Sequence, residues 1–586
     1  MQYYKRLIEH KALVAILLFL LSFGTFSFSL KNNFVWDDVE VIEKNYYSFK
    51  SAHITSIVIP KEQEKVIAYY RPMVPISMVV DWDIWGVSPF GFHLSNIIFH
   101  SISTVIFYFL VLVVLGEFGV DGKESVAFLS SILFALHPMH VESVSWVAGR
   151  TDVLCGLFFF LAFTFHILSY RKLRLLVLSA LCFFLSLISK EVALAFPIVA
   201  LGFDLLNRRR ANQAIMYSIL RYTAYAGLVL IYFYLREKEF ASVPGLSGEV
   251  VQQSTHNIYR VWEVLKVLLS SYLFYVNKLV FPFDFNAFIG IVPKGLYYLV
   301  SSTLVILILC VIGFISIKKK EDITAFSIFW IFTSLGPSSL IAIFNISSAP
   351  LAERYLYIPS AGYCMLIGYL IFKAGERIKN QKAVWAFIFL LSLLYLLFSI
   401  QRQGVWKDNL ALWSDTSEKS PYYAIVHSNY GMALRDAGKT DEAIRELSIA
   451  LNPEVKDTMR GRAATANNLG LAHIDKEDYR GAEKWFLKAL YYDSTYGKTY
   501  YHLGLIYFIK GENGNSVSDY RTAEGYLKKT LEMYISYGRA NLLLAKVYMR
   551  LGEREEAREQ AKMALRSGLI EPLSTEARGI LNGPEK

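Results

Sequence analysis

Long apolar stretches separated by short polar ones fill roughly the first 400 residues of the chain. A helix needs about 20 apolar residues to cross a bilayer, and fewer where neighbouring helices shield it. The pattern therefore predicts an all-α, polytopic bundle of about eleven transmembrane helices. The predicted spans are 12–30, 93–115, 125–139, 153–170, 173–189, 191–207, 213–235, 296–317, 322–346, 353–373 and 382–400.

Basic residues mark the loops on one side of this predicted bundle. If residue 1 lies in the cytoplasm, basic runs fall in the cytoplasmic loops at 171–174, 208–210, 318–320 and 373–382. Lys and Arg are enriched in such loops, so the net charge of +10 requires no nucleic-acid partner. These loops fall on the cytoplasmic side only if residues 259–282 do not cross the membrane. We expect an interfacial or re-entrant helix there. The N-terminus is then cytoplasmic, and the C-terminal part lies outside the cytoplasm.

A different period begins near residue 421 and predicts stacked helix pairs. Gly470 and Gly504, each preceded by Leu, lie 34 positions apart, which is the tetratricopeptide period. Four such units are expected, with a capping helix near 573–582. Stacked pairs form a concave groove suited to an extended peptide. The predicted organisation is a membrane domain over 1–400, a linker over 401–422 and a tetratricopeptide-repeat α-solenoid over 423–586.

The composition indicates a membrane protein and argues against two kinds of cysteine site. Charged residues make up 19% of the chain, whereas they make up about a quarter of soluble proteins. The four cysteines all lie in apolar segments, so neither a disulfide framework nor a thiol-based zinc site is expected. The expected location is the bacterial inner membrane, or the endoplasmic reticulum if the cell is eukaryotic.

Charged and polar residues gather in the loops of the outer face, where Asp37 and Asp38 follow the first span. Charged groups near membrane depth are costly and rarely face lipid. Each alone would be an interfacial anchor or a partner in a structural ion pair. Because several such groups converge on one face, the pattern favours a functional site. The other members are Arg71, His137, Glu142, Arg150, Asp152, Lys190, Glu191, Glu353 and Arg354.

These residue types suit the transfer of a sugar from a lipid phosphate. A carboxylate must accept the proton of the attacking hydroxyl, and Asp37 or Asp38 is predicted as this base. Cations must hold the departing phosphate. The predicted phosphate contacts are Arg71, Arg150, Lys190 and Arg354. Supporting roles, chiefly the orientation of these cations, are expected for His137, Glu142, Asp152, Glu191 and Glu353.

Two metal-binding patterns compete with this interpretation. Asp81-Trp82-Asp83 matches the Asp-x-Asp pattern of metal-dependent sugar-nucleotide transferases, but no nucleotide-binding fold surrounds it. Helix packing explains His93 and His100 better than a metal does, because they lack the i,i+4 spacing of a helical zinc site. No cofactor is firmly predicted. One alternative stays open, a divalent ion held by three acids: Asp37, Asp38 and Glu142.

The motifs of the outer face, taken in order, resemble a known family. It comprises the membrane O-mannosyltransferases with tetratricopeptide repeats, of the cadherin-targeting type, and their bacterial relatives. The resemblance covers nearly the whole chain, and the order of the motifs together with the repeats carries it. The matching segments are 37–38, 71–72, 137–142, 149–152, 190–191, 353–360 and 405–421.

This resemblance implies a GT-C glycosyltransferase fold and a polyprenyl- or dolichyl-phosphate sugar, mannose or another hexose, as the donor. It implies a Ser or Thr hydroxyl of an extracytoplasmic protein as the acceptor, held by the repeats. It also implies that Asp37 is the base, although the wider relatives have Asp-Glu where this sequence has Asp37-Asp38. The segment 281–290 matches the relatives' pattern only loosely.

A non-catalytic scaffold is the alternative from another class. In that interpretation the repeats recruit partners for envelope or secretory assembly, and replacing Asp37 has no effect. A transporter would need charged or helix-breaking residues near the middle of the membrane, whereas the charges here gather at one face.

Overall fold

The computed structural model describes residues 10–44, 70–207, 215–240, 258–344, 346–378, 380–534, 537–567, 569 and 571–583. Among these residues the regular elements are helices, and no strand forms. The chain divides into two compact units, Met1–Leu412 and Trp413–Lys586. The first contains the predicted membrane helices, and the second contains the predicted repeats.

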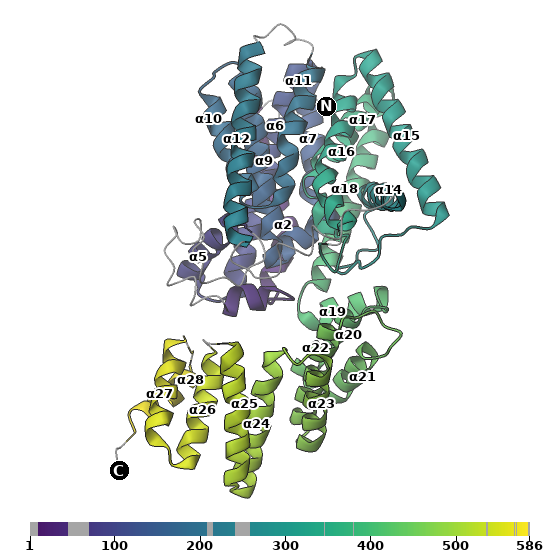
Figure 1. The fold of residues 1–586 in the computed structure, drawn as a ribbon. Coiled ribbons are helices and arrows are strands. Elements are labelled where there is room, and N and C mark those ends of the chain that lie inside the picture. The colour runs from purple at the N-terminus through teal and green to yellow at the C-terminus, as the bar shows by residue number, and fades with distance from the viewer. Residues whose placement is uncertain are drawn as a thin grey trace. The chain divides into compact units, whose positions relative to one another are not determined.

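Long helices build the first unit, and each predicted span corresponds to one of them (Figure 1). Seven helical segments in the described residues are long and apolar enough to cross a membrane, so the predicted all-α membrane fold is confirmed. The helices are α2 (Lys11–Phe26), α6 (Pro89–Phe118), α7 (Lys123–Leu136), α9 (Arg150–Ser169), α10 (Leu175–Leu187), α11 (Phe196–Leu206), α12 (Ile215–Phe240), α15 (Leu296–Lys319), α16 (Asp322–Ile343), α17 (Pro359–Arg377) and α18 (Gln381–Val405).

Four of these helices are not among the seven, for two reasons. The helices α7, α10 and α11 have 14, 13 and 11 residues, too few to cross a bilayer alone. Charged residues, among them Lys373 and Glu376, end α17. The predicted span 353–373 begins too early, because Glu353–Leu356 forms a separate turn, η7, before Pro359 opens α17. The number of crossings stays a prediction.

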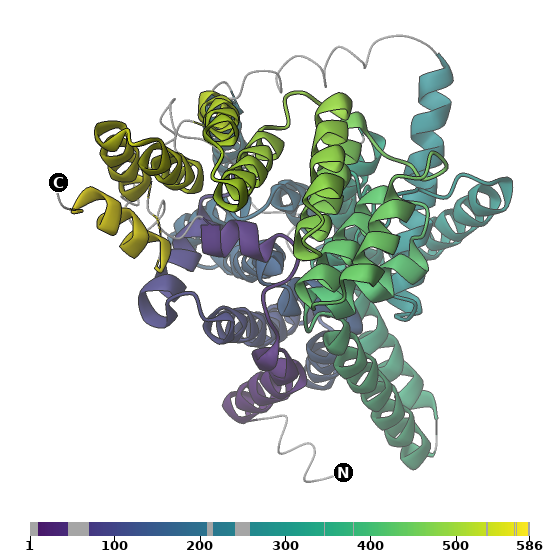
Figure 2. The ribbon, with the colours of Figure 1, turned by 90° about the horizontal axis from the view of Figure 1, so that it is seen from below.

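Helix α14 (Ile258–Val280) runs across the bundle instead of along it. Figure 1 shows it end-on beside the lengthwise helices, and Figure 2, turned by 90°, shows it from the side. It is not among the described helices that are apolar enough to span a membrane. Val261, Trp262 and Leu265 are exposed on it. This is the arrangement expected of an interfacial helix, and the membrane topology built on it stays a prediction.

Short helical turns form where several of the long helices end. Pro138 and Pro359 each open a new turn, since proline fits the first turn of a helix. His137 caps the first of these turns by accepting the N–H of Met139. Most of the candidate residues lie in or directly beside these short elements or η7. The short elements are η1 (Ser27–Lys31), η2 (Val39–Lys44), η3 (Pro138–His140), α8 (Val141–Ser145), η4 (Val147–Gly149) and η5 (Glu191–Ala195), and the 13-residue helix α5 (Met73–Trp85) follows Arg71.

Small residues allow the bundle helices to approach one another closely. Gly156 of α9 lies against the ring of Tyr357, and Gly368 of α17 lies against Ser130 of α7. A Cβ atom at either glycine would overlap these neighbours, so the close contact depends on the missing side chain. The first contact brings the segment that carries Arg354 against the helix that carries Asp152.

The second unit consists of helix pairs followed by a terminal helix. Gly431 lies against Leu447, and Gly470 against Phe486, so a small residue on one helix receives a large one from its partner. This is the packing of tetratricopeptide repeats, and the predicted α-solenoid is confirmed. The pairs are α20 (Ala424–Asp436) with α21 (Thr440–Ala450), α22 (Met459–Asp475) with α23 (Tyr479–Tyr492), α24 (Gly497–Gly514) with α25 (Val517–Met533) and α26 (Gly538–Leu551) with α27 (Arg554–Arg566), followed by α28 (Leu573–Leu581).

The stretch predicted as a linker, 401–422, is mainly helical. Helix α18 continues to Val405, and α19 occupies Asn409–Lys419. Trp406 and Trp413 are buried in this stretch. Apolar anchors of this size explain why it packs as part of the structure.

Candidate active site

Asp37 and Asp38 are neighbours in the sequence but lie in different environments. Asp38 is fully buried. Its Oδ2 accepts the N–H of Val35 at 3.1 Å, and its Oδ1 accepts the N–H of Ala148 at 2.8 Å. Burial raises the pKa of Asp38 to about 7, against the effect of these hydrogen bonds. Oδ2 therefore closes the turn within its own loop, and Oδ1 joins this loop to η4.

Asp37 is the exposed residue of the pair. The protein around it still displaces enough water to raise its pKa, an effect that Arg354 opposes and Glu40 reinforces. A carboxylate with a raised pKa is a better proton acceptor than an ordinary one. Asp37 therefore combines access from solvent with a nearby cation.

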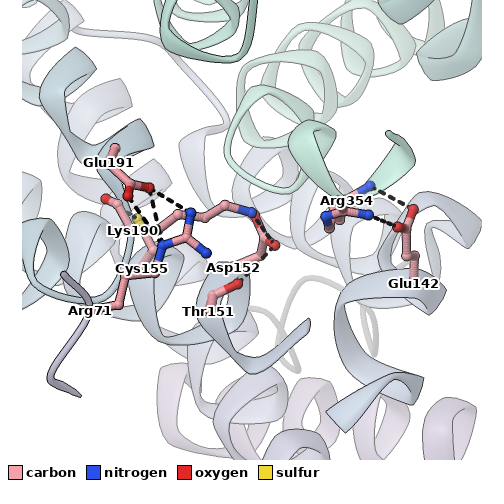
Figure 3. A network of polar contacts seen from close by, with 8 residues as sticks. All are labelled: Arg71, Glu142, Thr151, Asp152, Cys155, Lys190, Glu191 and Arg354. Carbon is pink, nitrogen blue, oxygen red and sulfur yellow. Dashed lines mark hydrogen bonds and ion pairs between the residues drawn. The ribbon is translucent and has the colours of Figure 1, made fainter. Parts of the chain in front are cut away.

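Three ion pairs form in the network that Figure 3 shows. Each joins residues from different segments of the chain, so the fold and not the local sequence brings them together. Arg71 pairs with Glu191 at 2.8 Å between Nη2 and Oε2, Lys190 pairs with Asp152 at 2.6 Å from Nζ to each carboxylate oxygen, and Arg354 pairs with Glu142.

Arg354 is the cation that acts on Asp37. Its backbone N–H donates to Glu142 Oε2 at 3.0 Å, and its guanidinium donates to Oε1. The guanidinium carbon lies 5.3 Å from the ring centre of Trp146 and 5.1 Å from that of Tyr355. Burial lowers the pKa of Arg354, but Glu142, Tyr355 and Asp152 together outweigh burial and raise it, so Arg354 stays positive. Its side chain is 14% exposed.

Lys190 and Arg71 share one electrostatic environment with Arg354. Burial lowers the pKa of Lys190, Arg71 and Arg354 act in the same direction, and Asp152 opposes them. The side chain of Arg71 is 22% exposed, whereas that of Lys190 is only 4% exposed. Arg71 and Arg354 can therefore meet a ligand, while Lys190 contributes mainly through its charge.

Arg150 lies in the core of the bundle instead of with these pairs. It is fully buried, and its Nη2 lies 2.5 Å from Oδ2 of Asp81. Its other N–H groups donate to Asn96 Oδ1 at 2.7 Å and to the carbonyl of Phe92 at 2.9 Å. Protein groups thus surround the guanidinium that was predicted to hold the donor phosphate. The Arg150–Asp81 ion pair also gives Asp81, the first acid of the Asp-x-Asp pattern, a structural role.

Glu353 precedes Arg354 but has other partners. Its Oε1 accepts the N–H of Asn286 at 2.7 Å, and its carboxylate lies 3.7 Å from Arg402 and 3.9 Å from Lys278. Burial raises the pKa of Glu353 to about 7, while Arg402 and Lys278 oppose the increase. Next to it is a cavity of about 300 Å³, lined in part by Asn277, Lys278, Asp284 and Asn286.

His137 packs among aromatic side chains inside the bundle. It is fully buried, and its ring centre lies 4.8 Å from that of Tyr395. The described residues contain no group of three or more His, Cys, Asp and Glu side chains that could hold a metal ion. Both oxygens of Asp38 and both oxygens of Glu142 accept hydrogen bonds from protein groups. Protein donors thus contact these two acids, which the alternative hypothesis assigned to a divalent ion.

Aromatic residues around Asp37 received no role from the sequence. Trp36 stacks on Trp146 with ring centres 5.1 Å apart, and Trp146 stacks on Trp406 at 5.8 Å. Each tryptophan stands in or beside one of the charged motifs, which is a weak signal for a shared site. Only the fold reveals that the three rings form one stack.

Comparisons with known proteins bear on both units. Residues 462–491 and 497–526 match two family models described as tetratricopeptide repeat. Protein O-mannosyl-transferase F38B6.6 of Caenorhabditis elegans is 28% identical over 404 residues, which cover 66% of this chain and 54% of that protein.

Two mammalian proteins give a similar result. Protein O-mannosyl-transferase TMTC4 of Mus musculus is 25% identical, with 72% of this chain and 64% of that protein covered. Protein O-mannosyl-transferase TMTC1 of Homo sapiens is 27% identical, with 68% and 49% covered. The chain thus spans about half to two thirds of the length of these relatives. The chain is similar to protein O-mannosyl-transferases over about two thirds of its length and has tetratricopeptide repeats in its C-terminal unit, as the order of its motifs predicted.

Proposed function

We propose that this protein transfers a hexose, in the first place mannose, from a polyprenyl- or dolichyl-phosphate carrier to a Ser or Thr hydroxyl of an extracytoplasmic protein. One observation carries the proposal: the exposed residue Asp37 lies in the field of Arg354, and Arg354 in turn acts with Arg71 on Lys190. The names of the relatives supply the reaction class. The apolar helices supply the bilayer in which the carrier lipid resides.

One base and the cations have separate roles in the proposed reaction. Asp37 takes the proton from the acceptor hydroxyl while its oxygen forms a bond to the anomeric carbon of the sugar. The bond from that carbon to the phosphate oxygen breaks, and the lipid phosphate leaves with the electron pair. Arg354 and Arg71 stabilise the charge on this leaving group, because preorganised cations need no rearrangement during the step.

The acids paired with these cations fix their positions. A buried cation without a partner would be costly, and Glu142, Asp152 and Glu191 remove that cost. Lys190 is nearly enclosed, so its charge acts over a distance through a medium of low polarity, where electrostatic interactions are strong. The cluster therefore attracts a phosphate while its side chains stay in place.

The pH dependence of transfer tests the link between Arg354 and Asp37. Arg354 lowers the pKa of Asp37, so the Arg354→Gln variant should have a higher Asp37 pKa. Because transfer requires the ionised carboxylate, activity is lost as the pH falls through this pKa. The loss should therefore begin at a higher pH in the variant when kcat is measured against pH. Arg71→Gln, which removes a cation paired with Glu191, should slow transfer without moving this limb. An unmoved limb in Arg354→Gln contradicts the link.

The repeats are proposed to hold the acceptor polypeptide. A bound acceptor has a high local concentration at the membrane site, so deletion of 421–586 should raise KM for long polypeptide acceptors about 100-fold. Binding of the lipid donor and transfer to a short Ser peptide should change little. Steady-state kinetics with both acceptors measure the difference. Equal loss of donor binding and of both acceptor reactions would mean that the repeats only support the fold.

Reconstitution tests the activity itself. The purified protein in liposomes is supplied with dolichyl- or undecaprenyl-phosphate [³H]mannose and a Ser/Thr-containing polypeptide, and alkali-labile label on the polypeptide is counted. Transfer that depends on protein and lipid donor is the expected result. If neither mannosyl nor glucosyl donors give label with natural extracytoplasmic acceptors, the scaffold alternative gains support.

A further inference from the structure

Trp36, directly before Asp37, has a backbone φ angle of 54°. This is the left-handed region, which a bulky L-residue rarely adopts. Such conformations persist only where surrounding contacts enforce them, and they concentrate at functional sites. One of the contacts that enforce this conformation comes from Asn409, 373 positions further along the chain.

Two kinds of contact hold Trp36. Its backbone N–H donates to Oδ1 of Asn409, the first residue of α19, at 2.8 Å. Its indole ring stacks on Trp146 with an angle of 16° between the planes, and Trp146 in turn stacks on the fully buried Trp406. The backbone of Trp36 is thus fixed from one side and its ring from another.

The chain before Trp36 is attached to the same distant segment. Gln403, near the end of α18, accepts the N–H of Ser29 at 3.2 Å through Oε1 and donates to the carbonyl of Thr25 at 2.8 Å through Nε2. Its carbonyl accepts from the Asn32 side chain at 3.3 Å. The carbonyl of Lys407 accepts the N–H of Asn33 at 2.9 Å.

We infer that Asn409 is a positioning residue for Asp37, and that Trp406 supports it. The turn at Trp36 sets the directions of the next two residues. Asp37 is exposed, while Asp38 is buried and accepts hydrogen bonds from Val35 and Ala148. A reacting group has to be held within about 0.5 Å of its working position. The segment between the last bundle helix and the repeats thus sets the place of the base. This inference rests on the proposed function.

The test compares two replacements at one position. Asn409→Leu removes the acceptor of the Trp36 N–H, and kcat for mannosyl transfer should fall about 10- to 100-fold. KM for the lipid donor should be unchanged, because the cations stay in place. Asn409→Asp keeps an acceptor oxygen at the same distance and should restore most of kcat. Lys407→Ala is the control, since it leaves the carbonyl that Asn33 contacts.

The outcomes separate this inference from the function it rests on. Wild-type kcat in Asn409→Leu, or an equal loss of kcat in Asn409→Leu and Asn409→Asp, overturns the positioning role while Asp37→Asn stays inactive. Full activity in Asp37→Asn overturns the proposed function instead. If Asn409→Leu fails to accumulate, Asn409→Ser replaces it in the comparison. The serine side chain is too short for its hydroxyl to reach the Trp36 N–H in place of the amide oxygen.

Discussion

Replacing Asp37 by Asn should reduce kcat for sugar transfer by about 10²- to 10⁴-fold, the range that a general base contributes. The amide has nearly the size of the carboxylate but cannot take the proton of the acceptor hydroxyl. Because the side chain is exposed, the melting temperature and the yield of the purified protein should match the wild type. Single-turnover transfer from the lipid donor and a melting curve on the same preparation measure both quantities.

Glu40→Gln is the matched control for this experiment. Glu40 is also exposed, and its charge raises the pKa of Asp37. Its loss should therefore leave the rate at neutral pH nearly unchanged and move the acid limb slightly to lower pH. Wild-type activity in Asp37→Asn would remove Asp37 from the mechanism. Equal losses in Asp37→Asn and Glu40→Gln would indicate a general effect of charge in this loop.

The second large effect is expected on stability, at Arg150. Arg150→Met leaves the buried carboxylate of Asp81 without its cation, and loss of one partner of a buried ion pair costs about 3–5 kcal/mol. The variant should accumulate poorly and should unfold at a clearly lower temperature than the wild type. Thermal unfolding in detergent micelles, followed by tryptophan fluorescence, is the measurement.

The double variant Arg150→Met, Asp81→Leu provides the control. An apolar pair of similar volume can replace a buried ion pair without loss, so this protein should regain much of the stability and some of the activity. The contrary result is an Arg150→Met protein that melts like the wild type but no longer binds the lipid donor. That result would return Arg150 to the phosphate site, where its sequence context suggested it belongs.

The sequence predicted the features that local pattern determines. Apolar stretches longer than a soluble helix requires identified the bundle, and the spacing from Gly470 to Gly504 identified the repeats. The cations and acids picked from the loops of one face also include the three pairs found in the fold. Charged groups near a bilayer rarely stay without a partner, so the members of these pairs could be predicted from the sequence alone.

The sequence could not distinguish residues whose roles depend on distant partners. Arg150 and Arg354 look alike in their motifs, but Arg150 meets Asp81 in the core, and Arg354 lies 14% exposed near Asp37. Asp37 and Asp38 are adjacent, and the left-handed turn at Trp36 precedes this pair. That turn is held by Asn409, 373 positions away, so no local pattern could have indicated it.

Mass spectrometry of extracytoplasmic proteins tests the central claim most directly. A strain that lacks this protein is complemented with the wild type, with Asp37→Asn or with Glu40→Gln, and hexose on Ser and Thr is mapped in each. We predict that the same set of hexosylated sites is present with the wild type and with Glu40→Gln, and is lost in the null strain and with Asp37→Asn. An identical set of sites in all four strains would contradict the account.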